Sequence, residues 1–272
     1  MTMTDSLVVT DLRVEFDGFV AVGGVSFDAH PGEVRFLIGP NGAGKTTCID
    51  AITGLSKGSG SVKLGDQELL GTSVNRIVRL GVGRTFQTAS VFEQLSVLQN
   101  LDIAAGLHRS SLSLLRARRG IEPAIESALE ETGLSTERET PAGILSHGQK
   151  QWLEIGMMLV QEPRALLLDE PVAGMSQDER TATGELLQRI AQRRIVLVVE
   201  HDMDFMRRYA SRVTVLHQGK VLSEGAVAQV QADPKVQEVY LGTAGAATTT
   251  AMLAVADTTT AAADTATQGE GA

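Results

Sequence analysis

A glycine-rich turn followed by a lysine and threonines carries the clearest chemistry in this sequence. Residues 39 to 46 read GPNGAGKT, which fits the pattern G-x-x-x-x-G-K-[ST] of phosphate-binding loops. The apolar run Val34–Ile38 precedes it, and a helix is predicted from Lys45 to Thr53. Glycines let backbone N–H groups surround phosphate oxygens, and the start of a helix adds positive potential. We expect Lys45 on the β- and γ-phosphates and Thr46 on Mg²⁺.

Two acidic residues, Asp169 and Glu170, end a second apolar run, Leu166–Leu168. A buried strand would deliver both carboxylates to the edge of the sheet where the phosphate-binding loop lies. Asp169 is expected to hold Mg²⁺ through its water shell, and Glu170 to polarise the attacking water as general base. Many strands end in acidic residues, so this pattern indicates a nucleotide site only because a phosphate-binding loop precedes it in the sequence.

The elements that must position these residues alternate between strands and helices. Continuous apolar runs at Ala165–Leu168 and Ile195–Val199 are typical of buried parallel strands. Helices are predicted at Gln149–Val160 and Asp178–Gln192, and the stretch from about 91 to 139 carries only helical signals. This order predicts an α/β protein with a parallel sheet and an inserted helical lobe at about 91–160. Two further predictions are an edge strand over Leu7–Phe16 and a hairpin of Val213–Leu216 and Val221–Leu222 around Gln218-Gly219.

Composition and charge limit the possible functions. The 272 residues carry a net charge of −9, which disfavours nucleic acid as a partner. The single Cys48 excludes a disulfide framework and a cysteine-rich zinc site, and the apolar runs are far shorter than a membrane span. Alanine and threonine dominate from Gly242 onward, so we expect a folded domain over 7–242 and a disordered tail over 243–272.

Leu145-Ser146-His147-Gly148-Gln149 resembles the LSGGQ signature of the ATP-binding cassette (ABC) ATPases, and it precedes Asp169 as in that family. Gln87 in Thr85-Phe86-Gln87 resembles the Q-loop glutamine, and His201 the switch histidine. Phe16 resembles the aromatic residue that stacks on adenine, although a strand-edge core position fits it equally well. The resemblance covers about Leu7 to Gly242. It implies a P-loop NTPase core with an antiparallel β subdomain and an inserted helical lobe.

The resemblance also implies that two chains sandwich two ATP molecules. The signature of each chain would then face the phosphate-binding loop of the other, and the second ATPase subunit would be an identical or a different chain. Glu170 and His201 would then be the catalytic residues. The alternative for His201 is a structural role as the cap of the following helix. The expected nucleotide contacts are Phe16, Gly39, Pro40, Asn41, Gly42, Ala43, Gly44, Lys45, Thr46, Thr47, Gln87, Ser146, His147, Gly148 and Gln149, and the expected Mg²⁺ ligands are Thr46, Gln87 and Asp169.

Two positions depart from the family pattern. His147 replaces the second glycine of the signature, where it could donate to the partner's nucleotide or point outward. Ser176 replaces the usual aspartate of the D-loop after Pro171, which puts coupling across the dimer through that position in doubt.

Within the family, the chain resembles importer ATPases for branched-chain amino acids and for urea or short amides, the urea type most. The stretches that carry this resemblance are 147–156, 170–175 and 213–219. It implies integral-membrane permease subunits as partners and a peripheral position on the cytoplasmic face of the inner membrane. Apolar surface for the permease is expected from Val91, Phe92, Leu95 and Val97, although packing inside the helical lobe fits any single one of them at least as well. The alternatives are a branched-chain amino acid importer ATPase or a soluble ABC-type ATPase outside transport.

Overall fold

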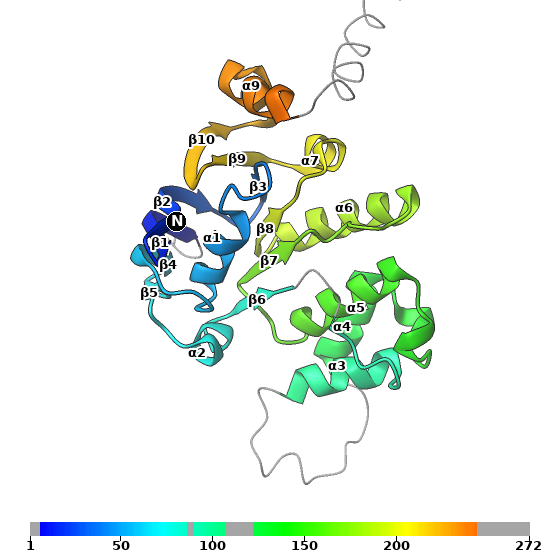
Figure 1. Ribbon diagram of the computed structural model, residues 1–272. Coiled ribbons are helices and arrows are strands. Elements are labelled where there is room, and N and C mark those ends of the chain that lie inside the picture. Colours follow the sequence, from blue (N-terminus) through cyan, green and yellow to red (C-terminus); the bar gives the residue numbers. More distant parts are fainter. Residues whose placement is uncertain (1–5, 86–89, 107–121, 244–272) are drawn as a thin grey trace, which may run out of the picture.

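The computed structural model describes residues 6–85, 90–106 and 122–243 of the chain. Its central sheet has six strands in the order β10-β9-β3-β8-β7-β6 (Figure 1). All neighbouring strands are parallel except β9 and β10, which form the predicted hairpin. The strands are β3 (Val34–Ile38), β6 (Val82–Arg84), β7 (Ala165–Asp169), β8 (Ile195–Val199), β9 (Arg212–His217) and β10 (Lys220–Gly225).

A second, antiparallel sheet lies beside the first, in the order β2-β1-β4-β5. Its strands are β1 (Leu7–Phe16), β2 (Phe19–Ala29), β4 (Ser59–Leu64) and β5 (Gln67–Glu68). The predicted strand Leu7–Phe16 therefore exists, but its placement at a sheet edge is wrong, because β1 pairs with β2 on one side and with β4 on the other. Alternating burial along β1 reflects its two faces and says nothing of its neighbours.

Helices cover the sheets in two groups, as Figure 1 shows. Next to the antiparallel sheet lie α1 (Lys45–Ile52) and α2 (Val74–Arg79). On the far side of the central sheet are α3 (Val97–Ala105), α4 (Pro123–Thr132), α5 (His147–Leu159), α6 (Gln177–Ala191) and α7 (Met203–Tyr209). The chain continues through α8 (Val227–Ala232) and α9 (Pro234–Thr243). The predicted helices at 149–160 and 178–192 are confirmed with shifts of one or two residues at their ends.

Alternate residues of the central strands point into different cores. Phe36 and Ile38 of β3 pack with the helices α3 to α7, whereas Leu37 between them packs with β1, β2 and α1. Because both faces of the sheet are covered, β3, β7 and β8 are buried along their whole lengths, and their sequences are apolar apart from Arg35 in β3 and Asp169 at the end of β7.

These layers confirm the predicted fold class of a P-loop core with an antiparallel β subdomain and a helical lobe. The domain limits stay predictions, and the proposed tail falls outside the described residues from 244 on. Within the described ranges, no helix is both long enough and apolar enough to cross a membrane.

Candidate functional site

The phosphate-binding turn leaves β3 at the carboxyl edge of the parallel strands, where ligands of open α/β sheets bind. Gly44 has φ +97°, and a Cβ added there would lie 2.6 Å from the carbonyl oxygen of Ala21. A Cβ on Gly39 would collide with the backbone of Leu216 in β9. Both glycines are therefore required by close backbone approach, which confines the turn to a tight curl between β2 and β9.

Lys45, the first residue of α1, folds back over this turn. Its Nζ donates to the carbonyl oxygens of Gly39 at 2.8 Å and Pro40 at 3.1 Å. The residue is only 8% exposed, and burial lowers its pKa, while the carboxylates of Glu170 and Asp169 act in the opposite direction. A lysine ammonium has three protons, so the third remains for a phosphate oxygen.

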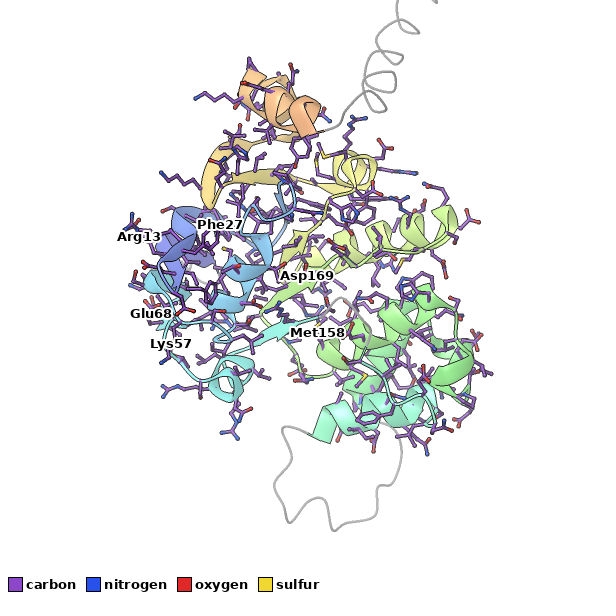
Figure 2. The ribbon with its side chains drawn as sticks, in the orientation of Figure 1. Arg13, Phe27, Lys57, Glu68, Met158 and Asp169 are labelled. Carbon is purple, nitrogen blue, oxygen red and sulfur yellow. The ribbon has the colours of Figure 1, made fainter. Side chains whose placement is uncertain are left out.

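Asp169 ends β7 near the middle of the molecule, between the antiparallel sheet that carries Phe27 and the helix α5 that carries Met158 (Figure 2). Its Oδ1 is buried and has no hydrogen-bond partner among the described residues. Burial raises the pKa of Asp169, and Arg84, whose Nη2 lies 3.7 Å from Oδ2, opposes this shift. The backbone N–H of Asp169 donates to the hydroxyl of Thr85. An unsatisfied carboxylate oxygen beside a phosphate-binding turn fits a hard cation such as Mg²⁺.

Glu170 and His201, the two predicted catalytic residues, meet in the structure. Oε1 of Glu170 lies 3.2 Å from Nδ1 of His201, because Glu170 follows β7 and the His201 turn follows β8, the neighbouring parallel strand. Glu170 adopts a left-handed φ of +51°, and its N–H donates to the carbonyl oxygen of Val199 at the end of β8. Helix α7 is capped by Asp202, which accepts from the N–H of Phe205, so the interpretation of His201 as that helix cap is wrong.

Glu200 is a site residue that the sequence analysis missed. Its side chain is 1% exposed and accepts three backbone hydrogen bonds, from the N–H groups of Val172, His201 and Asp202. Burial raises the pKa of Glu200, and these hydrogen bonds oppose the shift. The carboxylate thereby links the turn after β7 to the turn that carries His201. The available signal was an acid directly after the apolar run 195–199.

The signature residues form the N-terminus of α5. Ser146 is the N-cap, and Gln149 completes a capping box in which each side chain binds the backbone N–H of the other residue. His147 is exposed, but its ring lies against the D-loop of the same chain, with Nε2 3.0 Å from the carbonyl oxygen of Ala173. In the described part of the chain, the signature turn contacts α6 and the D-loop and makes no hydrogen bond to the phosphate-binding turn of the same chain.

No hydrogen bond or ion pair described above links the predicted nucleotide contacts Phe16 and Gln87 to the phosphate-binding turn. Phe16 ends β1, opposite Phe19, and is 49% exposed, so it is not a core residue. Gln87 lies outside the described residues. The assignments of single residues to ATP and Mg²⁺ stay predictions that the geometry fits.

A phosphate-binding turn between a buried strand and a helix, with acids at the end of a neighbouring strand, defines a P-loop nucleoside triphosphatase. A family model described as ABC transporter matches residues 22–173, more than half of the chain. A second model, described as a branched-chain amino acid ATP-binding cassette transporter, matches residues 220–246. The chain belongs to the ABC transporter family, and it is an ATP-hydrolysing transporter subunit.

Several characterised relatives are similar over nearly their full length. The high-affinity branched-chain amino acid transport ATP-binding protein LivG of Escherichia coli (strain K12) is 36% identical, over 88% of this chain and 98% of the relative. The corresponding BraF of Pseudomonas aeruginosa is 34% identical over the same shares. Among solved structures, the ADP conformation of MJ1267, an ATP-binding cassette of an ABC transporter, superimposes with a TM-score of 0.76 at 30% identity, covering 88% of this chain and 99% of that one.

Proposed function

We propose that this chain energises the import of branched-chain amino acids by hydrolysing ATP at the cytoplasmic face of the inner membrane, where permease subunits hold it. The observation that carries the proposal is the 36% identity to a branched-chain amino acid transport ATPase over 98% of that protein. The match of residues 220–246 to a model of the same transporter type adds support at the C-terminal end. The sequence patterns put urea or short amides first, but the comparisons favour the amino-acid alternative.

In this proposal the phosphate-binding turn and Lys45 hold the triphosphate, and Thr46, Asp169 and Gln87 hold Mg²⁺. When bound, Mg²⁺ supplies positive charge against the developing charge on the phosphates. Glu170 takes a proton from the attacking water, and His201, which already lies against Glu170, donates to the γ-phosphate. The buried acceptor Glu200 holds the His201 backbone in place through two hydrogen bonds to that turn.

We further propose that two ATPase subunits form the complete site. Ser146, His147, Gly148 and Gln149 of one subunit would face the phosphate-binding turn of the other, because within one chain these residues contact α6 and the D-loop instead. The N-cap hydroxyl and the N–H groups of the first turn of α5 form an anion site that suits a γ-phosphate.

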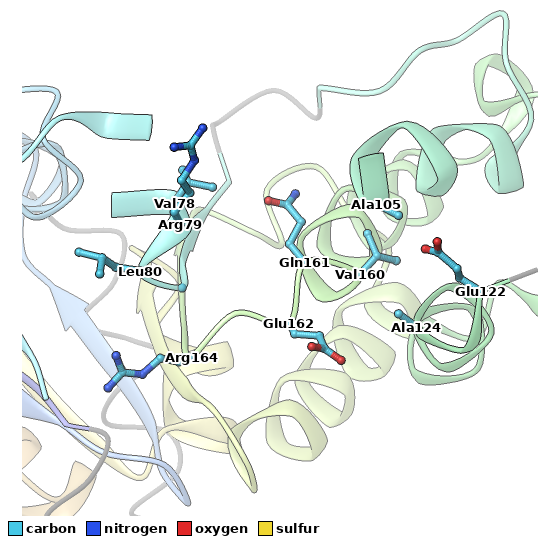
Figure 3. A pocket seen from close by; sticks show the side chains of 11 residues that line it. Val78, Arg79, Leu80, Ala105, Glu122, Ala124, Val160, Gln161, Glu162 and Arg164 are labelled. Atoms are coloured by element: carbon cyan, nitrogen blue, oxygen red, sulfur yellow. The ribbon is translucent and has the colours of Figure 1, made fainter. Parts of the chain in front are cut away.

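The permease would dock near the boundary between the P-loop core and the helical lobe. Phe92 is 51% exposed there, and the buried Asn100 fixes its backbone by accepting from the N–H and donating to the carbonyl oxygen of Phe92. Val97 is fully buried inside the lobe, so its prediction as docking surface is wrong. A cavity of about 520 Å³ lies between α2–β6 and the helices of the lobe (Figure 3). Its lining residues include Leu80, Ala105, Val160 and Arg164.

Uptake of labelled leucine and labelled urea in source cells tests the proposed function. Cells carrying the native chain are compared with cells carrying Glu170→Gln at equal expression, and Glu185→Gln on the exposed face of α6 is the matched control. Loss of leucine uptake in Glu170→Gln alone supports the proposal. Selective loss of urea uptake would return the assignment to the urea type, and unchanged uptake of both would favour an ATPase outside import of these solutes.

The docking surface is tested by Phe92→Asp. A charge at this exposed ring is expected to abolish transport while ATP binding by the purified chain stays at the native level. Loss of ATP binding in this variant would refute the assignment of Phe92 to the permease interface.

A further inference from the structure

The carboxylate of Glu179, in the first turn of α6, lies directly on the signature turn. Its Oε1 accepts hydrogen bonds from the hydroxyl of Ser146 at 2.7 Å and from the N–H of Gly148 at 3.3 Å. Its Oε2 accepts from the N–H and the hydroxyl of Ser176, both at 2.9 Å. One side chain thus joins the signature motif to the end of the D-loop.

These donors are the ones that the proposed dimer assigns to the partner's γ-phosphate. The hydroxyl of Ser146 and the N–H of Gly148 each carry one proton. While both point to Glu179, neither is free for a phosphate oxygen. A carboxylate and a phosphate are also both anions, so their charges would repel one another at this site.

The carboxylate leaves no room beside the helix start. A Cβ added to Gly148 would lie 2.6 Å from Oε1 of Glu179 and 2.7 Å from its Cδ. The hydrogen bonds, first that from Ser146 and then those from Ser176, lower the pKa of Glu179 to about 2. The side chain is therefore charged throughout the physiological pH range.

We propose that Glu179 occupies the signature anion site as an internal substitute for the γ-phosphate, and that ATP-driven closure of the dimer requires this side chain to swing away. This contact of Glu179 with Ser146 and Gly148, called the latch below, keeps the isolated subunit from pairing and sets the ATP concentration at which dimers form. This inference rests on the ATP sandwich in the proposed function. The swing requires only side-chain rotation, because Glu179 is partly exposed and the N–H of Glu179 itself stays bonded to Ser176.

The test compares dimer formation by two full-length proteins, Glu170→Gln and Glu170→Gln/Glu179→Gln, over a range of ATP concentrations by sedimentation velocity. Glutamine keeps the capping box of α6, since its amide oxygen can still accept from Ser176, but it loses the charge and one acceptor oxygen. We expect the double variant to dimerise at about tenfold less ATP, the factor that corresponds to losing one hydrogen bond to a charged group.

Asp178→Asn in the same background is the matched control, because Asp178 is the exposed neighbouring acid on the same turn. It removes the same charge and should leave the ATP midpoint unchanged. Glu179→Ala in that background serves as a second test, with its melting temperature measured to separate loss of the α6 cap from loss of the latch.

Each outcome decides something different. A lower ATP midpoint with Glu179→Gln, but not with Asp178→Asn, supports the latch. An equal or higher midpoint overturns it and leaves the sandwich standing. If none of the variants dimerises with ATP, the sandwich itself is contradicted, and the latch falls with it.

Discussion

Arg84, the last residue of β6, joins the phosphate-binding helix to the acid at the end of β7. Its Nη1 lies 2.5 Å from Oδ1 of Asp50 and 3.0 Å from the hydroxyl of Thr53, both at the end of α1. Its Nη2 lies 3.7 Å from Oδ2 of Asp169. The Arg84 side chain is only 8% exposed, so the substitution Arg84→Met preserves its apolar stem and removes the charge that these three groups face.

The magnitude follows from the burial of the partners. Removing one member of a buried ion pair costs about 3–5 kcal/mol. Asp50 is 29% exposed and can regain water, which reduces its share to about 1.5 kcal/mol, the lower end of the range for a hydrogen bond to a charged group. Asp169 is 3% exposed and cannot rehydrate as freely. We therefore expect Arg84→Met to lower the free energy of unfolding by about 3 kcal/mol.

Urea denaturation of Arg84→Met, of Asp50→Asn and of the double variant Arg84→Met/Asp50→Asn measures the direct coupling energy between Arg84 and Asp50. A coupling energy of about 1.5 kcal/mol is expected for groups in contact. Arg76→Met on the exposed face of α2 is the control and should change stability by less than about 0.5 kcal/mol. A loss below about 1 kcal/mol for Arg84→Met would show that the charge of Arg84 does not stabilise the buried carboxylate of Asp169.

Three further predictions concern other parts of the chain. Cys48 is fully buried, and burial raises its pKa to about 12. Iodoacetamide at pH 8 should therefore label only the unfolded protein, and rapid labelling of the folded chain would contradict this. The free energy of unfolding should also fall as the pH rises above about 9, because only the unfolded thiol ionises there. Gly184→Ala places a Cβ against the ring of Tyr209, and this overpacking should lower the free energy of unfolding by about 1–2 kcal/mol in urea, despite the better helix propensity of alanine. The hydrogen bonds of Glu179 lower its pKa from 4.5 to about 2. Their contribution to the free energy of unfolding is therefore complete above pH 4.5 and is lost as the pH falls to 2. If Glu179→Ala keeps the full native slope of stability against pH in this range, another group causes that slope.

The local chemistry was predictable because it follows from short, contiguous patterns. The strands Val34–Ile38 and Ile195–Val199 are buried on both faces, and their sequences, apolar apart from the buried Arg35, are typical of such strands. The phosphate-binding turn is equally visible, since Gly39 and Gly44 occupy positions where a Cβ would meet backbone. The resemblance to ABC ATPases assigned Glu170 and His201 to one site, and the structure brings them together because each follows one of two paired parallel strands.

Long-range contacts were not predictable from such patterns. The alternation of Leu7–Phe16 is the same for an edge strand and a central one, and only its pairing with β4 decides between them. Glu179 and Ser146 are 33 residues apart on two helices, and their contact depends on how α5 packs on α6, where Trp152 donates to the hydroxyl of Thr183. No pattern along the chain encodes that packing.

Steady-state ATP hydrolysis by the purified chain, with ATP binding measured in parallel, tests the role of Glu170 most directly. If Glu170 is the general base, Glu170→Gln binds ATP as the native chain does but hydrolyses it about 10²–10⁴-fold more slowly, the usual contribution of such a group. Hydrolysis at the native rate in Glu170→Gln would contradict the assignment of Glu170 as the base. Loss of ATP binding in that variant would contradict the separation of the base from the phosphate-binding turn.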